Sequence, residues 1–162
     1  MGSGISGIYS GTLEKSQKYA SSYGVTPNML QFDINRGVYD TTYEKNPTAK
    51  NIYEVINGEY IISKNRDRYL TYVIDMNDNI IVAERNGNGF GGKATPHPTL
   101  IGGISPKVKM AGIIYLEKGK ITSYDHHSGH YKPNIKSMDV AKKAFDKLPD
   151  YLFKGGKKKW KK

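Results

Sequence analysis

The 162-residue chain contains no cysteine, and this absence excludes a disulfide scaffold, a thiolate zinc site and a cysteine nucleophile. The chain also lacks any apolar run near the roughly 20 residues that a membrane-crossing helix requires. We therefore expect no membrane insertion. A chain of this length can bury one sizeable hydrophobic core, so we expect a single domain over residues 1–153.

Acidic residues are scarce relative to basic ones, with 15 against 25 and a formal net charge of +10. Much of this excess comes from residues 154–162, which hold six lysines and no acid. Without that segment, 19 basic and 15 acidic residues remain, a net charge of +4. We expect a disordered basic tail over 154–162, of the kind that either contacts RNA or keeps a protein soluble.

Three pairs of β-branched and aromatic runs predict antiparallel hairpins, because the loops that join them are too short for a crossover connection. The pairs are 52–56 with 59–63, 69–75 with 80–84, and 109–117 with 120–124. In the first pair Asn57-Gly58 would form the turn, since these residues tolerate the positive φ of a type I′ turn. The sequence thus predicts about six strands.

Helices are predicted near both ends of the chain. Residues 137–148 have a serine in the N-cap position, an acid in the first turn, a proline after the last turn and apolar residues at 3–4 spacing. A weaker helix is predicted over 12–23, and residues 86–106 form a Gly/Pro-rich loop of the length that is often functional. We expect an α+β fold, in which a twisted antiparallel sheet carries the terminal helices on one side.

The four histidines fall within one window of 34 residues, at His97, His126, His127 and His130. Histidine has an unperturbed pKa close to neutral pH, so a pair can give and take a proton in one reaction. Turn-forming residues around the last three predict a loop after the strand at 120–124. We interpret His126 and His127 as exposed turn residues, and His97 and His130 as the candidate catalytic pair.

Metal binding is the alternative use of these histidines. Zinc could be held by His97, one or two of the later histidines and Asp125. However, the spacing matches no zinc motif, and a loop does not provide the shared helical face of H-E-x-x-H proteins. We therefore expect neither a metal nor another cofactor.

Two imidazoles suit cleavage of RNA through its own 2′-hydroxyl. One removes the 2′-OH proton, the other protonates the leaving 5′-oxygen, and a cation or backbone N–H stabilises the charge on phosphorus. Ser128 and Tyr131 could donate hydrogen bonds to a phosphate oxygen, although packing is the other explanation for the tyrosine. The candidate phosphate-binding cations are Arg85, Lys93, Lys107 and Lys132.

A set of short motifs lies between residues 95 and 133. They are His97-Pro98-Thr99-Leu100, Gly102-Gly103, Val108-Lys109-Met110-Ala111-Gly112-Ile113-Ile114, Gly119-Lys120-Ile121 and Ser128-Gly129-His130-Tyr131-Lys132-Pro133. The pattern resembles C-terminal toxin domains of bacterial polymorphic toxins, the variable tips of Rhs, WapA-like and contact-dependent inhibition proteins. A similar Ser-Gly-His-Tyr-x-Pro segment occurs in plant IQ-motif calmodulin-binding proteins, but this chain has no IQ motif. The match covers under a quarter of the sequence.

The resemblance implies a toxin that is secreted as the tip of a larger protein, acts in the cytoplasm of a target cell and is neutralised by a cognate immunity protein. Many such tips are RNases, often cutting tRNA, with a small helix-plus-antiparallel-sheet fold. By position, the pattern favours His97, Ser128, His130 and Tyr131 as functional residues. The leading prediction is a metal-independent endoribonuclease used in interbacterial competition.

Two other functions stay open. An ADP-ribosyltransferase or other NAD-consuming toxin would take Arg36 and Glu84 as NAD-binding and catalytic residues, with Tyr131 against the nicotinamide. A non-catalytic nucleic-acid-binding module would use the positive charge of the chain without performing a reaction.

Overall fold

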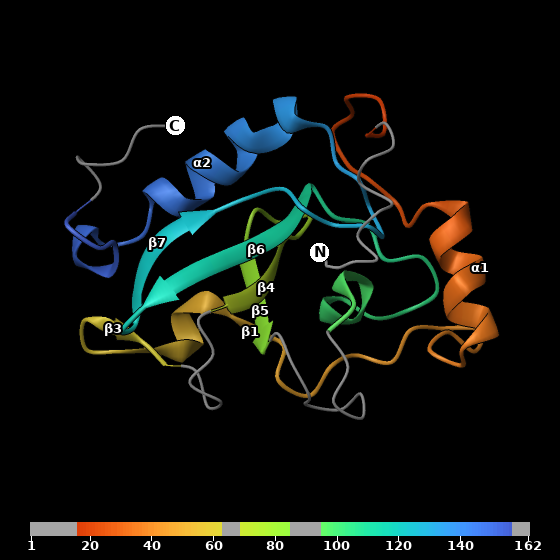
Figure 1. Cartoon of the computed structure of the whole chain (residues 1–162), viewed down its shortest axis with the longest axis horizontal. Helices are drawn as coiled ribbons and strands as arrows, with labels where there is room; N and C mark the ends of the chain where they lie inside the picture. Colours follow the sequence, from red (N-terminus) through yellow and green to blue (C-terminus); the bar gives the residue numbers. More distant parts are fainter. Residues whose placement is uncertain (1–15, 63–68, 85–94, 157–162) are drawn as a thin grey trace.

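The computed structural model describes residues 16–62, 69–84 and 95–156, and they form an α+β fold. Its centre is a twisted five-stranded antiparallel sheet in the order β1-β5-β4-β6-β7 (Figure 1). The strands of this sheet are β1 (Lys50–Asn51), β4 (Tyr69–Ile74), β5 (Ile80–Glu84), β6 (Met110–Glu117) and β7 (Lys120–Tyr124). The predicted fold class and the second and third predicted hairpins are confirmed.

The first predicted hairpin is shorter than expected. A second, two-stranded sheet pairs β2 (Ile56–Asn57) with β3 (Tyr60–Ile61), and Asn57 lies opposite Tyr60. The turn therefore centres on Gly58 and Glu59 rather than on Asn57-Gly58, and Gly58 takes the positive φ of +65° that the turn requires. The turn thus lies one residue later than predicted, and Ile56 pairs with Ile61 rather than with Glu59.

The start of that hairpin is helical because of a local cap. The 3-10 helix η2 (Ile52–Val55) begins after Asn51, whose side chain accepts a hydrogen bond from the amide of Tyr53. Glu54 in turn accepts from the backbone N–H of Asn51 at 3.2 Å. This reciprocal pair is a capping box, and it overrides the β propensity of the isoleucine and valine.

The C-terminal helix is confirmed as α2 (Met138–Asp146), which follows the short 3-10 helix η4 (Ile135–Ser137). The sequence predicted that the Ser137 side chain caps this helix, but that side chain makes no capping hydrogen bond. The Ser137 hydroxyl lies 2.7 Å from the hydroxyl of Tyr23 instead. The predicted N-terminal cap is thus a long-range contact between two distant segments.

The expected helix over 12–23 is wrong in its described part, because residues 16–23 are not helical. Tyr23 exchanges backbone hydrogen bonds with Val108 in an isolated antiparallel bridge, and this tertiary pairing overrides local propensity. The N-terminal helix is instead α1 (Pro27–Asn35), which starts with proline at its first position. In Figure 1, α1 lies at the end of the molecule away from β3, and α2 runs beside β7.

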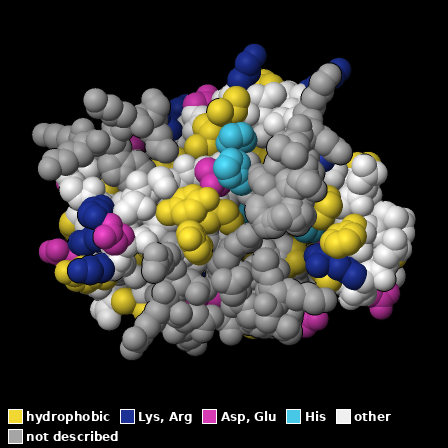
Figure 2. Space-filling model, in the orientation of Figure 1, with side chains coloured by type: hydrophobic (Ala, Val, Ile, Leu, Met, Phe, Trp, Pro, Cys, Tyr) yellow, Lys and Arg dark blue, Asp and Glu magenta, His cyan; other side chains and the backbone are white. Residues whose placement is uncertain are grey.

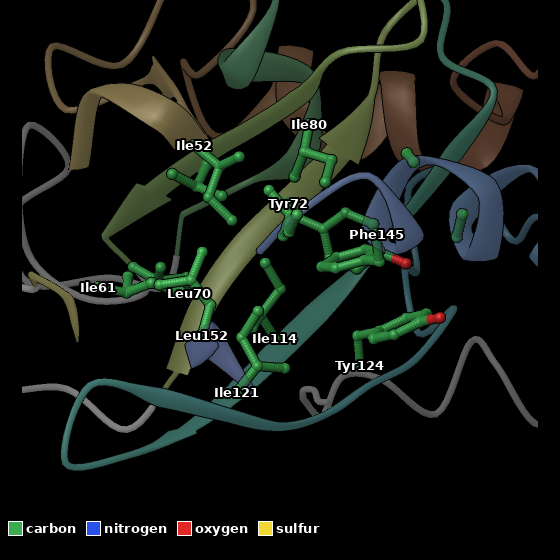
Figure 3. Packing of buried hydrophobic residues seen from close by; sticks show 14 of the residues in the cluster. Ile52, Ile61, Leu70, Tyr72, Ile80, Ile114, Ile121, Tyr124, Phe145 and Leu152 are labelled. Atoms are coloured by element: carbon green, nitrogen blue, oxygen red, sulfur yellow. The ribbon is translucent and has the colours of Figure 1, made fainter. Parts of the chain in front are cut away.

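One face of the sheet packs against α2 and forms the larger core (Figure 3). Tyr72 on β4 and Tyr124 on β7 meet Phe145 on α2, and the rings of Tyr124 and Phe145 stack with centroids 3.9 Å apart. The short helix η5 (Asp150–Leu152) adds Leu152 to this core. Because one face of α2 packs against this core, its apolar residues recur at helical spacing in the sequence.

The opposite face carries a second, smaller core without a long helix. Its buried members are Tyr23, Val73, Ala83, Leu100, Val108, Ala111 and Tyr131. The 3-10 helix η3 (His97–Leu100) supplies Leu100, and all four of its residues are buried. The described end of the predicted 86–106 loop is therefore partly core, while residues 86–94 lie outside the described ranges.

Candidate functional site

A buried carboxylate gathers three side chains at the end of α1. We call this set the Asp33 cluster (Asp33, Arg36, Tyr43 and His130). One oxygen of Asp33 accepts hydrogen bonds from the Tyr43 hydroxyl at 2.7 Å and from His130 Nε2 at 2.8 Å. The other accepts from Arg36 Nε at 3.0 Å and lies 2.9 Å from Arg36 Nη2. Asp33 is 0% exposed, so four donors surround a carboxylate without access to solvent.

The electrostatics of the Asp33 cluster keep this carboxylate charged. Burial by itself would raise its pKa, but the hydrogen bond and charge of His130, the Tyr43 hydroxyl and the Arg36 guanidinium together hold the pKa of Asp33 below its usual value. Burial and the Asp33 carboxylate raise the pKa of Tyr43, whose hydroxyl stays protonated. Asp33 is the buried residue of α1, and the cluster thereby ties α1 to the segments that carry Tyr43 and His130.

His97 and His130, the pair favoured from the sequence, are both buried, at 5% and 8% exposure. His97 Nε2 lies 2.8 Å from the carbonyl oxygen of Gly112, which joins η3 to β6. His130 Nε2 donates to Asp33. Each ring thus holds two parts of the fold together, and their catalytic role stays a prediction.

Ser128 and Tyr131 also make internal contacts. The Ser128 hydroxyl accepts a hydrogen bond from the amide of Tyr131 at 3.2 Å, and Ser128 is 1% exposed. The Tyr131 ring is 0% exposed in the second core, and its hydroxyl donates to the carbonyl of Pro106 at 2.9 Å. Burial raises the pKa of Tyr131. These contacts support packing as the explanation for the tyrosine.

The predicted phosphate-binding cations have different surroundings. Arg85 and Lys93 lie outside the described residues. Lys107 is exposed, whereas Lys132 is half-buried with a φ of +43°, and its amide donates to the carbonyl of Ser128.

The alternative NAD-binding pair is also engaged within the protein. The Arg36 guanidinium is paired with Asp33, and Glu84 is 7% exposed at the end of β5. The backbone of Glu84 accepts a hydrogen bond from Thr95 and donates one to Thr48. The structure therefore does not present an exposed, unpaired Arg36 opposite an exposed Glu84.

The accessible imidazoles belong to His126 and His127, directly after β7. We call the set Asp125, His126, His127 and Tyr115 the histidine-pair site. Asp125 organises it: one carboxylate oxygen accepts from the Tyr115 hydroxyl at 2.8 Å and lies 3.1 Å from His127 Nδ1. The other oxygen accepts from the amides of Ile113 and His127, at 2.9 and 3.0 Å. The carboxylate therefore fixes both the loop backbone and the His127 ring.

The approach of Asp125 to β6 depends on Gly112. A Cβ built on Gly112 would lie 2.0 Å from the backbone oxygen of Asp125, so a side chain at this position would displace the loop. The same Asp125 oxygen accepts a hydrogen bond from the Tyr72 hydroxyl at 2.6 Å. The site thus rests on a glycine and a buried tyrosine of the central strands.

The two rings of the histidine-pair site have centroids 5.5 Å apart, and their pKa values are shifted in opposite directions. The hydrogen bond to Asp125 raises the pKa of His127, whose side chain is 51% exposed. Partial burial and the neighbouring charge of His127 lower the pKa of His126. Adjacent groups with opposed pKa shifts provide one proton donor and one proton acceptor at the same pH.

Figure 2 shows histidine side chains next to an acidic side chain and a hydrophobic patch on one face of the molecule. The sequence had predicted that His126 and His127 are exposed turn residues; in the structure His127 is exposed and His126 is half-buried. The role of Asp125 as their organiser was missed, although its position two residues before His127 was a signal for such a pair. The importance of Asp33 had no signal in the local sequence.

Within residues 16–62, 69–84 and 95–156, no group of three or more His, Asp or Glu side chains is arranged to hold a metal ion. No helix of that same part of the chain is long and apolar enough to span a membrane. Comparison of the chain with protein-family models, curated proteins and solved structures gives no match.

Proposed function

We propose that this protein is a metal-independent endoribonuclease whose acid and base are His127 and His126. The observation that carries the proposal is the Asp125-oriented His127 ring beside His126, with opposed pKa shifts. A hydrogen bond spans about 2.8 Å, so two rings 5.5 Å apart can contact neighbouring oxygens of one phosphodiester. The proposal keeps the predicted chemistry and assigns it to a different histidine pair.

The reaction follows from the two protonation states. Neutral His126 removes the proton of the ribose 2′-OH, whose oxygen attacks phosphorus, and protonated His127 gives its proton to the departing 5′-oxygen. The bond between phosphorus and the 5′-oxygen breaks, and the products are a 2′,3′-cyclic phosphate and a free 5′-hydroxyl. The Asp125 carboxylate orients His127 and stabilises its imidazolium, as a positioning residue.

The test is cleavage of single-stranded RNA by the purified protein in EDTA, with the end groups of the products identified. We expect 2′,3′-cyclic phosphate ends, and a loss of about 100-fold or more in kcat for His126→Ala and for His127→Ala, since a general acid or base contributes 10²–10⁴-fold. Ser21→Ala, which changes an exposed residue outside the site, is the matched control. Full activity in both histidine variants would contradict the assignment.

Variants of the other pair separate the two possible sites. His97→Gln and His130→Gln keep much of each side chain's volume, and we expect them to lower thermal stability while the folded fraction retains activity. Loss of cleavage in stably folded His97→Gln or His130→Gln, with active His126→Ala and His127→Ala, would return the catalytic role to the buried pair.

The biological setting is the second part of the proposal, and it is supported by the resemblance to polymorphic-toxin tips. We infer that the shared segment marks scaffold residues, because His97, Ser128, His130 and Tyr131 all make buried contacts. The protein would be delivered into a target cell, cut RNA there (tRNA is one candidate), and be inhibited by a cognate immunity protein. Growth arrest on expression in bacteria, absent in His127→Ala and relieved by a neighbouring gene product, tests this setting.

A further inference from the structure

Two tyrosines continue the histidine-pair site across the sheet. Tyr69 on β4 lies directly opposite Tyr115 on β6, and their rings pack edge to face with centroids 5.3 Å apart. Tyr115 donates its hydroxyl hydrogen bond to Asp125, which in turn contacts His127. A continuous chain of contacts thus runs from the exposed imidazole to Tyr69.

Tyr69 and Tyr115 differ in what they can offer a ligand. Tyr115 is half-buried and committed to Asp125 through its hydroxyl. Tyr69 is 42% exposed, and within the described residues no hydrogen bond to its hydroxyl is recorded. Tyr115 holds the Tyr69 ring by an edge-to-face contact, so Tyr69 presents aromatic surface in a fixed orientation.

Tyr69 and Tyr115 lie on the face of the sheet that carries the second core. Side chains alternate along a strand, so Tyr69 projects from the same face as Val73 and Tyr115 from the same face as Ala111. Val73 and Ala111 are buried in the second core, whereas Tyr69, at the start of β4, is exposed to solvent. In Figure 2 hydrophobic side chains adjoin histidine and acidic side chains on one face.

We propose that Tyr69 is a base-stacking residue that selects single-stranded RNA and places its backbone against the histidine pair. Every base has a π-face, whereas the bases of a duplex are already stacked on one another, so an exposed ring favours an unpaired strand. The net charge of +10 favours a polyanion over an apolar or cationic peptide. The inference rests on the proposed function, because it names the substrate of that site.

The experiment separates binding from cleavage with a 2′-O-methyl oligoribonucleotide, which cannot supply the attacking hydroxyl. Its affinity is measured for the wild type, Tyr69→Ala, Tyr69→Leu and Tyr69→Phe. Stacking on an aromatic residue contributes about 1–3 kcal/mol per base, so we expect Tyr69→Ala to weaken binding about 5- to 150-fold. Tyr69→Leu restores apolar bulk without a π-face and should stay weak, whereas Tyr69→Phe should bind like the wild type.

Two further readouts complete the test. Annealing the same oligonucleotide to its complement should weaken binding to the wild type, and this difference should shrink in Tyr69→Ala. With cleavable RNA, Tyr69→Ala should raise KM more than it lowers kcat, whereas His127→Ala should lower kcat and leave binding of the analogue intact. Thermal unfolding of each variant confirms that the folded protein is being compared.

The outcomes distinguish this inference from the proposed function. Unchanged binding of the analogue by Tyr69→Ala, or equal binding of single-stranded and duplex oligonucleotides by the wild type, overturns the role of Tyr69 even if RNA is cut. Binding of the analogue that depends on Tyr69, in a protein that cuts no RNA, supports the stacking role and overturns the nuclease. Binding with Leu at position 69 equal to the wild type would also overturn stacking.

Discussion

Asp33 and Asp125 are both held as anions, but their surroundings lead to different uses. Asp33 is buried, and its oxygens contact three buried or half-buried side chains. Asp125 contacts the exposed ring and the backbone amide of His127, and its other contacts are with Ile113 and Tyr115 of β6. Burial raises the pKa of Asp125, but the hydrogen bonds of His127 and Ile113 outweigh this effect and lower it. Asp33 therefore links buried parts of the fold, whereas Asp125 orients the exposed ring of the proposed general acid.

Replacing Asp125 by asparagine should weaken the hydrogen bond, and remove the charge, that raise the pKa of His127. Because the proposed acid must be protonated, activity falls as the pH rises through the pKa of His127; the base His126 must be neutral, so activity also falls as the pH drops through its lowered pKa. We expect Asp125→Asn to move the alkaline limb of the kcat profile toward lower pH. The acid limb should move less and in the same direction, because the Asp125 charge also raises the pKa of His126. An NMR titration of the His127 ring checks the shift directly. An unmoved alkaline limb would show that His127 is not the acid.

Replacing Asp33 by alanine should destabilise the protein by about 3–5 kcal/mol, as expected when one partner of a buried ion pair is removed. Tyr43 and His130 would lose their acceptor inside the protein. The sign of the pH dependence follows from the lowered pKa of Asp33: its contribution is complete above the unfolded value near 3.9 and is lost as the pH falls through the folded value. Urea unfolding from pH 2 to 7 should therefore show a weaker loss of stability with acid in Asp33→Ala. A wild-type acid limb in that variant would contradict the pairing.

At the scale of elements, the sequence was informative where a strand or helix is stabilised by its own pattern. The hairpins β4–β5 and β6–β7 and helix α2 follow from alternation, short loops and amphipathic spacing. The non-helical 16–23 segment and α1 do not, because the first depends on the pairing of Tyr23 with Val108 and the second on one buried aspartate. The candidate site follows the same division. Exposure of His127 could be predicted from its loop, whereas its link to Asp125 and Tyr115 depends on the register of β6 against β7.

The glycine of β6 allows a prediction about the element that carries the site. Gly112→Ala would place its Cβ 2.0 Å from the backbone oxygen of Asp125. Only movement of the β6 backbone or of the loop after β7 can relieve this overlap. We expect a large loss of thermal stability, and loss of cleavage even at temperatures where the protein stays folded. Gly129→Ala is the matched control in the loop after β7 that carries Asp125, since its added Cβ meets nothing within 4 Å. Equal behaviour of the two variants would mean that Asp125 does not need its present distance from β6.

At the scale of the whole molecule, the sheet separates two tasks. One face buries the larger core against α2, and the other carries the smaller core and the histidine-pair site at its margin. The residues that the sequence pattern favoured as functional lie in or around the smaller core: His97, Ser128, His130 and Tyr131. The more accessible titratable side chains precede the Ser-Gly-His-Tyr motif: Asp125, His126 and His127.

Much of the positive charge of the chain lies in its last residues, so its effect on RNA binding can be tested apart from catalysis. Residues 157–162 contain five lysines, and their deletion lowers the net charge from +10 to +5. For a single strand, removing one lysine that neutralises a phosphate reduces the slope of log K against log salt concentration by about 0.7. We expect the deletion to flatten the salt dependence of binding to long RNA, while kcat on a short oligonucleotide at saturation changes less than about twofold, because the acid–base pair and Tyr69 are retained. A fall in kcat as large as that of His127→Ala would instead place one of these lysines at the reacting phosphate.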